Sequence, residues 1–88
     1  MKNLKELEEE LKKYDGKNIT IRIDGSLKLG ILIHNLKSMV TSRKIIFSNY
    51  NFKLNEEVEI CLDDVIDIEL GQEIILQMNG NYNIYIST

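Results

Sequence analysis

The spacing of the hydrophobic residues changes once along this chain, near residue 18. Before that point Leu4, Leu7 and Leu11 recur at intervals of three and four residues, which is the spacing of one apolar stripe on a helix. After it, apolar residues occupy every second position over most of the chain, which is typical of strands with one buried face. The pattern predicts a helix over residues 3–14 and a β structure over residues 18–88.

Glycine-containing turns divide the β region into hairpins. Gly25 and Gly80 each follow a short polar residue between two alternating segments, a position typical of tight turns. At both turns only a loop with an odd number of residues leaves the apolar side chains of the two strands on one face. For the first hairpin we expect a three-residue loop over residues 23–25, with Gly25 left-handed and Ile21 opposite Leu27.

Further segments rich in isoleucine, valine, leucine and tyrosine predict more strands. They cover residues 43–48, 57–62, 65–70, 73–78 and 82–87. Six or seven short antiparallel strands close most economically into a small bent barrel of the SH3-like or Sm-like kind, because closure leaves no unpaired edge. We therefore expect a mostly β fold with an N-terminal helix, such a barrel and an extra C-terminal hairpin. The alternative is an α+β open sheet with one helix across it.

The length and the apolar runs limit the organisation of the chain. We expect a single domain over residues 1–88, because each half of so short a chain would bury too little apolar surface to be stable. No apolar run approaches the roughly 18 residues that a membrane-spanning helix needs, and the charged opening stretch differs from a secretory signal. We expect a cytoplasmic protein that does not contact a membrane.

The charges are divided unevenly along the chain. Residues 1–53 hold all 11 basic residues and six acidic ones, a net charge of +5. Residues 54–88 hold eight acidic residues and no basic one, a net charge of −8. A domain with such halves can use its acidic part to attract a basic surface on another protein or on a second copy of itself. The same acidic surface could imitate a polyanion, as a regulatory or phage-type inhibitor protein does.

Residue groupings typical of enzymes are missing from the sequence. One cysteine, Cys61, and one histidine, His34, are too few for a zinc site of these ligands or for an internal disulfide. No pattern of nucleophile, base and carboxylate occurs, and no glycine-rich phosphate loop. We expect a non-catalytic protein without metal, cofactor or small-molecule substrate. Cys61 stands between two large apolar residues, which predicts a buried thiol.

Two groups of residues are candidates for binding a protein partner. The first is acidic and consists of Asp63, Asp64, Asp67 and Glu69. Strand alternation and the lack of a glycine-containing calcium loop argue against a metal site there, which leaves a recognition surface or a merely solvated sheet face. The second group is the helix stripe of Leu4, Leu7 and Leu11. A twelve-residue helix is marginal alone in water, so this stripe must dock on the domain's own sheet or on another molecule.

A rival hypothesis is binding of RNA or DNA through basic residues of the first three strands. The candidates are Arg22, Lys28, His34, Lys37, Arg43 and Lys44. The negative net charge and the lack of aromatic residues interleaved with these cations argue against it. For His34, an ordinary surface position is the alternative to a stacking or proton-switch role.

Residues 4–36 resemble the first half of the Sm-like motif. The resemblance rests on an amphipathic helix followed by the sequence GKNITIRIDGS at residues 16–26 and GIL at residues 30–32. It implies a small barrel and supports the nucleic-acid hypothesis. The dipeptide at residues 34–35 is the nearest counterpart of the aspartate and asparagine with which Sm-like proteins contact RNA.

Residues 43–70 are similar to the closing strands of YolD-like proteins of Firmicutes. The sequence IIF at residues 45–47 leads through a polar segment to ICLDDVIDIEL at residues 60–70, in which an apolar strand meets an acidic turn and an isoleucine-rich strand. This resemblance implies a small non-enzymatic interaction protein.

Overall fold

The chain folds into one helix and a set of short strands. The computed structural model describes residues 4–51 and 57–88. The elements within them are α1 (Leu4–Lys12), β1 (Ile19–Asp24), β2 (Lys28–Ile33), β3 (Leu36–Val40), β4 (Lys44–Asn49), β5 (Val58–Cys61), the 3-10 helix η2 (Leu62–Asp64), β6 (Val65–Leu70), β7 (Ile74–Met78) and β8 (Tyr82–Ser87). The mostly β fold with an N-terminal helix is thus confirmed.

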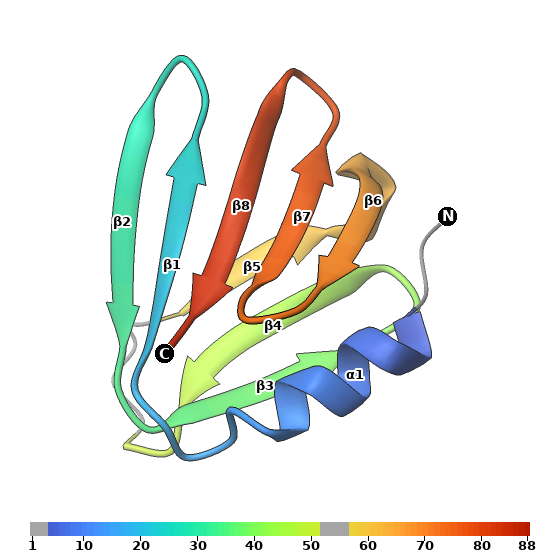
Figure 1. Cartoon of the computed structure of the whole chain (residues 1–88). Coiled ribbons are helices and arrows are strands. Elements are labelled where there is room, and N and C mark those ends of the chain that lie inside the picture. Colours follow the sequence, from blue (N-terminus) through green and yellow to red (C-terminus); the bar gives the residue numbers. More distant parts are fainter. Residues whose placement is uncertain (1–3, 52–56) are drawn as a thin grey trace.

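The strands form two antiparallel sheets that pack against each other. The larger sheet has the order β2-β1-β8-β7-β6 and the smaller one the order β3-β4-β5. Figure 1 shows the smaller sheet running across the larger one, with α1 beside β3. The wall of the expected barrel is therefore divided into two sheets, joined where β2 leads into β3 and where β5 leads through η2 into β6. The C-terminal hairpin, β7 and β8, completes the larger sheet because β8 pairs with β1.

The strand β3 was not expected from the sequence. The chain leaves the larger sheet after Ile33 and begins β3 at Leu36, so the change of sheet occurs at residues 34–35. Asn35 has a φ of 55°, in the left-handed region where asparagine is among the more readily accepted residues. The corner is thus made by a local backbone turn.

The hairpin loops have the expected odd length but one unexpected register. In the first hairpin Asp24 lies opposite Lys28, so the three loop residues are 25–27 instead of the expected 23–25. The ladder extends further than expected, and Ile21 lies opposite Ile31 instead of Leu27. Gly25 does not have the left-handed φ we expected. This position requires a glycine for lack of space, because a Cβ at Gly25 would lie 2.6 Å from the Cβ of Tyr82.

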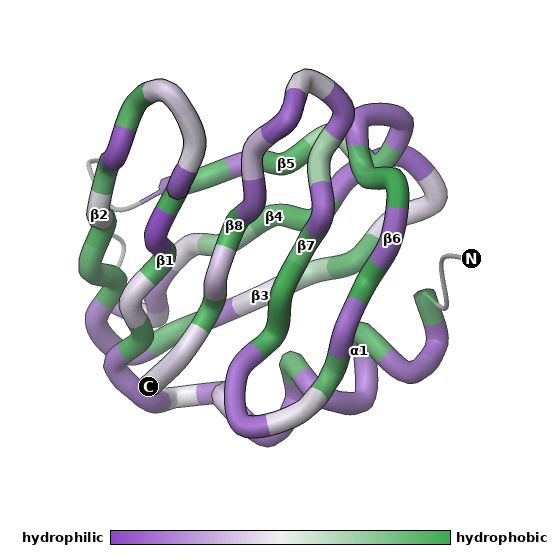
Figure 2. The backbone as a smooth tube through the Cα atoms, turned by 45° about the horizontal axis from the view of Figure 1, so that its top comes forward, coloured by the Kyte–Doolittle hydropathy of each residue, from purple (hydrophilic) through white to green (hydrophobic). Residues whose placement is uncertain are grey.

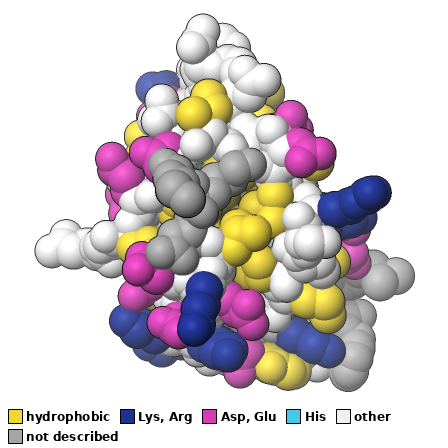
Figure 3. All heavy atoms as spheres, turned by 90° about the vertical axis from the view of Figure 1, so that its right-hand side faces the viewer, with side chains coloured by type: hydrophobic (Ala, Val, Ile, Leu, Met, Phe, Trp, Pro, Cys, Tyr) yellow, Lys and Arg dark blue, Asp and Glu magenta, His cyan; other side chains and the backbone are white. Residues whose placement is uncertain are grey.

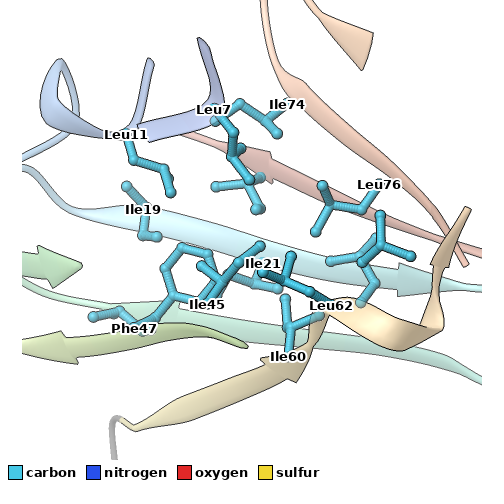
Figure 4. Packing of buried hydrophobic residues seen from close by; sticks show 14 of the residues in the cluster. Leu7, Leu11, Ile19, Ile21, Ile45, Phe47, Ile60, Leu62, Ile74 and Leu76 are labelled. Atoms are coloured by element: carbon cyan, nitrogen blue, oxygen red, sulfur yellow. The ribbon is translucent and has the colours of Figure 1, made fainter. Parts of the chain in front are cut away.

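The helix closes the core between the two sheets. Leu7 and Leu11 are fully buried and Leu4 is partly buried against the same cluster, which also includes residues from both sheets (Figure 4). The helix begins at the first described residue and ends two residues earlier than expected, while residue 3 lies outside the described residues. Leu7 and Leu11 therefore dock on the protein's own sheets and expose no surface to a partner, which corrects their assignment to a binding site, whereas Leu4 stays partly exposed. In the described part of the chain, no helix is long and apolar enough to cross a membrane.

Candidate interaction surface

One face of the larger sheet carries no second layer of described residues. Hydrophobic and hydrophilic residues are interspersed along its strands (Figure 2), and most of the apolar ones point into the core. We call the opposite side the outer face. Its residues are Thr20, Arg22, Asp24, Lys28, Gly30, Leu32, Asp67, Glu69, Ile75, Gln77, Asn83, Tyr85 and Ser87. Because a strand alternates with a period of two, the pattern that fills the core also produces this exposed polar surface.

The first row across the outer face is entirely polar. The strand register places Lys28, Asp24, Asn83, Gln77 and Asp67 side by side, from β2 at one edge to β6 at the other. A lysine therefore stands at one end of the row and a carboxylate at the other. The amides between them can donate and accept hydrogen bonds, which suits recognition of a polar surface.

The second row has an apolar centre between charged ends. Arg22 lies beside Tyr85, Tyr85 beside Ile75, and Ile75 beside Glu69. The guanidinium of Arg22 stacks over the Tyr85 ring at 4.9 Å from its centroid and donates to Oε2 of Glu73 at 3.2 Å. Shallow hollows on the β6 side of this face are lined by Glu69 and Ile75. The row presents an aromatic ring, an aliphatic side chain and charges of both signs.

The four candidate carboxylates do not share one surface. Asp67 and Glu69 lie on the outer face, whereas Asp63 and Asp64 lie on η2, where the chain passes between the sheets. The backbone carbonyl of Asp64 accepts a hydrogen bond from the Asn79 amide at 2.7 Å. The period of two ends at the 3-10 turn, which separates the two pairs. Only Asp67 and Glu69 therefore remain candidates for the outer face.

Asp67 is held in its charged form by the backbone. The amide of Ile68 donates to Oδ1 of Asp67 at 2.9 Å, and this hydrogen bond lowers the pKa of the carboxyl below its ordinary value of 3.8. A register shift between Val65 and Asp67 marks a bulge at this point of β6. Folding therefore favours the charged form of Asp67.

The basic candidates are separated and two of them are paired with carboxylates. Arg22 and Lys28 line a hollow beside the first hairpin, whereas Arg43 and Lys44 line another hollow with Glu59, Cys61 and Asp63. Lys44 Nζ lies 2.8 Å from Oε1 of Glu59, and Arg22 is paired with Glu73. These pairs join the basic half of the sequence to its acidic half. On the side where β6 and α1 lie, acidic and basic side chains are interspersed around a hydrophobic patch (Figure 3).

His34 stands beside a hydrogen-bonded corner that the sequence did not predict. The Asn35 amide donates to Oδ1 of Asn18 at 3.1 Å, and the Tyr50 amide donates to the Asn35 carbonyl at 3.0 Å. The Tyr50 hydroxyl donates to Oδ1 of Asp15 at 2.8 Å, which raises the pKa of Tyr50. This corner ties the end of the helix to both sheets. His34 itself is exposed, as the surface alternative predicts.

Cys61 is exposed, contrary to the prediction of a buried thiol. Both neighbours are buried, because Ile60 points inward from β5 and η2 then turns Leu62 back into the core. Cys61 lies opposite Lys44 at one end of β4, while His34 shortly precedes Leu36, which lies opposite Asn49 at the other end of β4. The two ends of this six-residue strand are roughly 16 Å apart. Among the described residues, no group of three or more His, Cys, Asp or Glu is arranged to hold a metal ion.

Comparisons with family models, curated proteins and solved structures give no match to this chain. The Sm-like and YolD-like resemblances therefore stay predictions.

Proposed function

We propose that the protein is a non-catalytic interaction module that binds a protein partner through the outer face of the larger sheet. The observation that carries the proposal is the row in which Tyr85 and Ile75 lie between Arg22 and Glu69. An aromatic and an aliphatic side chain surrounded by polar groups have the composition of a protein interface. In this proposal Asp67 and Glu69 face basic groups of the partner.

The pairing of the cations favours a protein partner over the Sm-like alternative. Nucleic-acid binding depends on cations that can approach successive phosphates. Arg22 and Lys44 instead each contact a glutamate, and Arg43 and Lys44 lie apart from Arg22 and Lys28 in different hollows. The same mixture of charges favours a partner of mixed charge over a long basic groove, so the proposal does not include imitation of a polyanion.

The proposal includes neither a catalytic step nor a cofactor, and it places the protein in the cytoplasm. Its support is the lack of enzymatic residue patterns in the sequence and the exposure of a single cysteine, since free thiols persist in reducing compartments.

A capture experiment with two outer-face variants and one control variant tests the proposal. The full chain, immobilised, is exposed to an extract of the cells that make it, in parallel with Glu69→Lys, Tyr85→Ala and Glu8→Lys. Glu8 is the matched control, because it is an exposed glutamate of α1 away from the outer face. We expect a protein that the wild type and Glu8→Lys retain equally and that the other two variants lose. Equal retention by all four forms, or no retained protein, would overturn the proposal.

A titration with single-stranded RNA and double-stranded DNA at low and at physiological salt tests the alternative. Phosphate contacts are strongest at low salt, so this is the condition at which nucleic-acid binding would be easiest to detect. Under the protein-partner proposal we expect no binding even there. Binding that falls with salt and is lost in Arg22→Glu and Lys28→Glu would replace the protein-partner proposal by a nucleic-acid function.

A further inference from the structure

The edges of the two sheets differ in how they are protected against pairing with another chain. An edge strand leaves a row of backbone N–H and C=O groups unpaired, and bulges, inward or flanking charges and covering elements prevent its extension. Within the described residues, β6 has a bulge after Val65 and the carboxylates of Asp67 and Glu69. The edge at β3 is covered by α1. The edge at β5 has only four residues, carries Glu59 and ends in η2.

Among the described residues, the edge at β2 has neither a bulge nor a covering element. It is six residues long, pairs with β1 without a register shift and has no second strand neighbour in the described chain. Its only charged residue is Lys28, and the strand is hydrophobic over most of its length (Figure 2). Leu29 and Leu32 are 49% and 51% exposed, and Leu27, just before the strand, is 71% exposed. The exposed leucines lie on both faces of the strand, as in a strand from the interior of a sheet.

We propose that β2 pairs with β2 of a second copy of this chain, antiparallel and with Gly30 opposite Gly30 on a two-fold axis. The two larger sheets would then form one continuous sheet with β2 strands at its centre. The pairing uses the edge of β2, whereas the partner-binding proposal rests on Tyr85, Ile75 and Glu69 on the strands β8, β7 and β6, so either proposal can fail without the other.

The sequence of β2 is self-complementary in this register. A two-fold axis perpendicular to the sheet pairs residues of the same face, so residues whose numbers sum to a constant even number lie opposite each other. With Gly30 on the axis, Leu29 lies opposite Ile31 of the second copy, and Leu27 lies opposite Ile33 of the second copy. Ile33 is fully buried in its own core and Ile31 partly so. The exposed leucines of each copy thus continue the core of the other.

The outer side of β2 also fits this register. Lys28 lies opposite Leu32 of the second copy, where the lysine stem can cover the leucine while its ammonium stays in water. If the two-fold axis passed through Ile31 instead, Lys28 would lie opposite His34. If it passed through Leu29, Leu32 would lie opposite Ser26. Either change would lose the pair of Lys28 with Leu32. At the axis Gly30 has no side chain, and a Cβ there would meet nothing within 4 Å. The observed sequence therefore favours this register over its neighbours.

The dimension of the edge predicts a weak, reversible dimer. Six residues extend over about 20 Å at the usual strand rise. A standard stable interface buries roughly 800 Å² per partner, more than a single strand edge with three leucines offers. We therefore expect a dissociation constant that is micromolar or weaker, about 1 µM to 1 mM.

Sedimentation equilibrium of the full chain over a concentration series from about 1 µM to 1 mM, the range of the expected dissociation constant, measures this association. We expect a reversible monomer–dimer equilibrium in the wild type. In Leu29→Lys and Leu32→Lys the dissociation constant should rise at least about tenfold. The lysine at position 29 would be buried against Ile31 of the second copy without a partner, and the lysine at position 32 would lie opposite Lys28 of the second copy, a pair of like charges. Ile66→Lys is the matched control, since Ile66 is 52% exposed on the β6 edge, and it should dimerise like the wild type.

A cysteine at the axis tests the register. Gly30→Cys in a Cys61→Ser background should form a disulfide-linked dimer under mild oxidation, whereas Ile66→Cys in the same background should not. Adding Leu32→Lys to the Gly30→Cys chain should abolish the link. A wild-type chain that stays monomeric up to 1 mM would overturn the proposal, and so would loss of the dimer in Ile66→Lys. A dimer in which Gly30→Cys does not link would overturn the register. Reversal of Glu69 should leave the dimer intact whatever the outer face binds.

Discussion

The two edges of the larger sheet belong to one layer but are built from opposite kinds of sequence. The strand β6 ends the sheet with a bulge and with Asp67 and Glu69 among its apolar residues, and α1 packs near it. The strand β2 ends the sheet with a regular ladder, one lysine and exposed leucines. The difference shows that both the backbone regularity of an edge strand and its charges decide how well the edge is protected, and that the β2 edge has no bulge and a single charge, Lys28.

The largest difference in the free energy of unfolding should appear between Leu7, buried beneath α1, and Leu29, on the β2 edge. Leu7→Ala should lower the free energy of unfolding by about 2–5 kcal/mol, because it leaves a cavity beneath α1 where the side chain is fully buried. Leu29→Ala should cost about 1 kcal/mol or less, because half of that side chain is already exposed. Urea unfolding at micromolar protein concentration, where the chain is mostly monomeric, measures both values. Equal losses would show that the β2 side is as tightly packed as the helix side.

Two glycines of the first hairpin sharpen the comparison on the β2 side itself. Gly25→Ala should destabilise the protein by about 1–3 kcal/mol, because the added Cβ would lie 2.6 Å from the Cβ of Tyr82 and force the hairpin tip away from β8. Gly30→Ala should be neutral or stabilise by up to about 1 kcal/mol, since its Cβ meets nothing within 4 Å and glycine weakens a strand interior. Thermal unfolding of the two variants beside the wild type gives the order of stability. A destabilisation by Gly30→Ala that equals that of Gly25→Ala would contradict this account.

The spacing of the hydrophobic residues predicted the fold class, because it reflects which side chains are buried and both sheets bury one face in the same core. It located the helix stripe and the odd loop lengths, since those follow from which face each side chain occupies. It failed at β3, where Ser38 interrupts the apolar inward positions and exposed Met39 occupies an outward one. The prediction for Cys61 failed for another reason, because it rested on the usual burial of free cysteine, whereas Cys61 points outward between the buried Ile60 and Leu62.

The candidate site was harder to predict, because the order of the charged residues along the sequence does not give their arrangement in the folded protein. The sequence divides into a basic and an acidic half, but β8 pairs with β1 and β5 pairs with β4, which brings the halves together. Asp67 and Glu69 could be placed on an outward face by alternation alone. Their separation from Asp63 depends on the turn between them, and the neighbours Tyr85 and Ile75 depend on strand order, which no local pattern encodes.

The ion pairs that join the two halves should contribute little to stability. Lys44 and Glu59 are each about half exposed, so Glu59→Gln should lower the free energy of unfolding by only about 0.2–1 kcal/mol. The loss should shrink in 1 M NaCl, because salt screens exposed pairs. Urea unfolding at low and high salt tests this, with Glu8→Gln on the exposed face of α1 as the control for removal of a glutamate. A salt-independent loss would show that Glu59 acts through packing at the β5 edge instead of through its charge.

The smallest effect concerns the carboxylate that protects the β6 edge. The Ile68 amide lowers the pKa of Asp67 in the folded protein below its ordinary value of 3.8. The charged form is therefore favoured by folding, and its contribution is present above pH 3.8 and is lost as the pH falls through the lowered folded value. Asp67→Asn keeps an oxygen that can accept the same hydrogen bond but removes the charge. The variant should be slightly less stable than the wild type at pH 6, and the two urea midpoints should converge as the pH falls through the lowered pKa of Asp67. Because acid acts on every other carboxylate equally in both chains, a difference that stays constant over this fall in pH would show that Asp67 contributes through its shape alone. In that case the bulge, and not the carboxylate, would be what distinguishes this edge from β2.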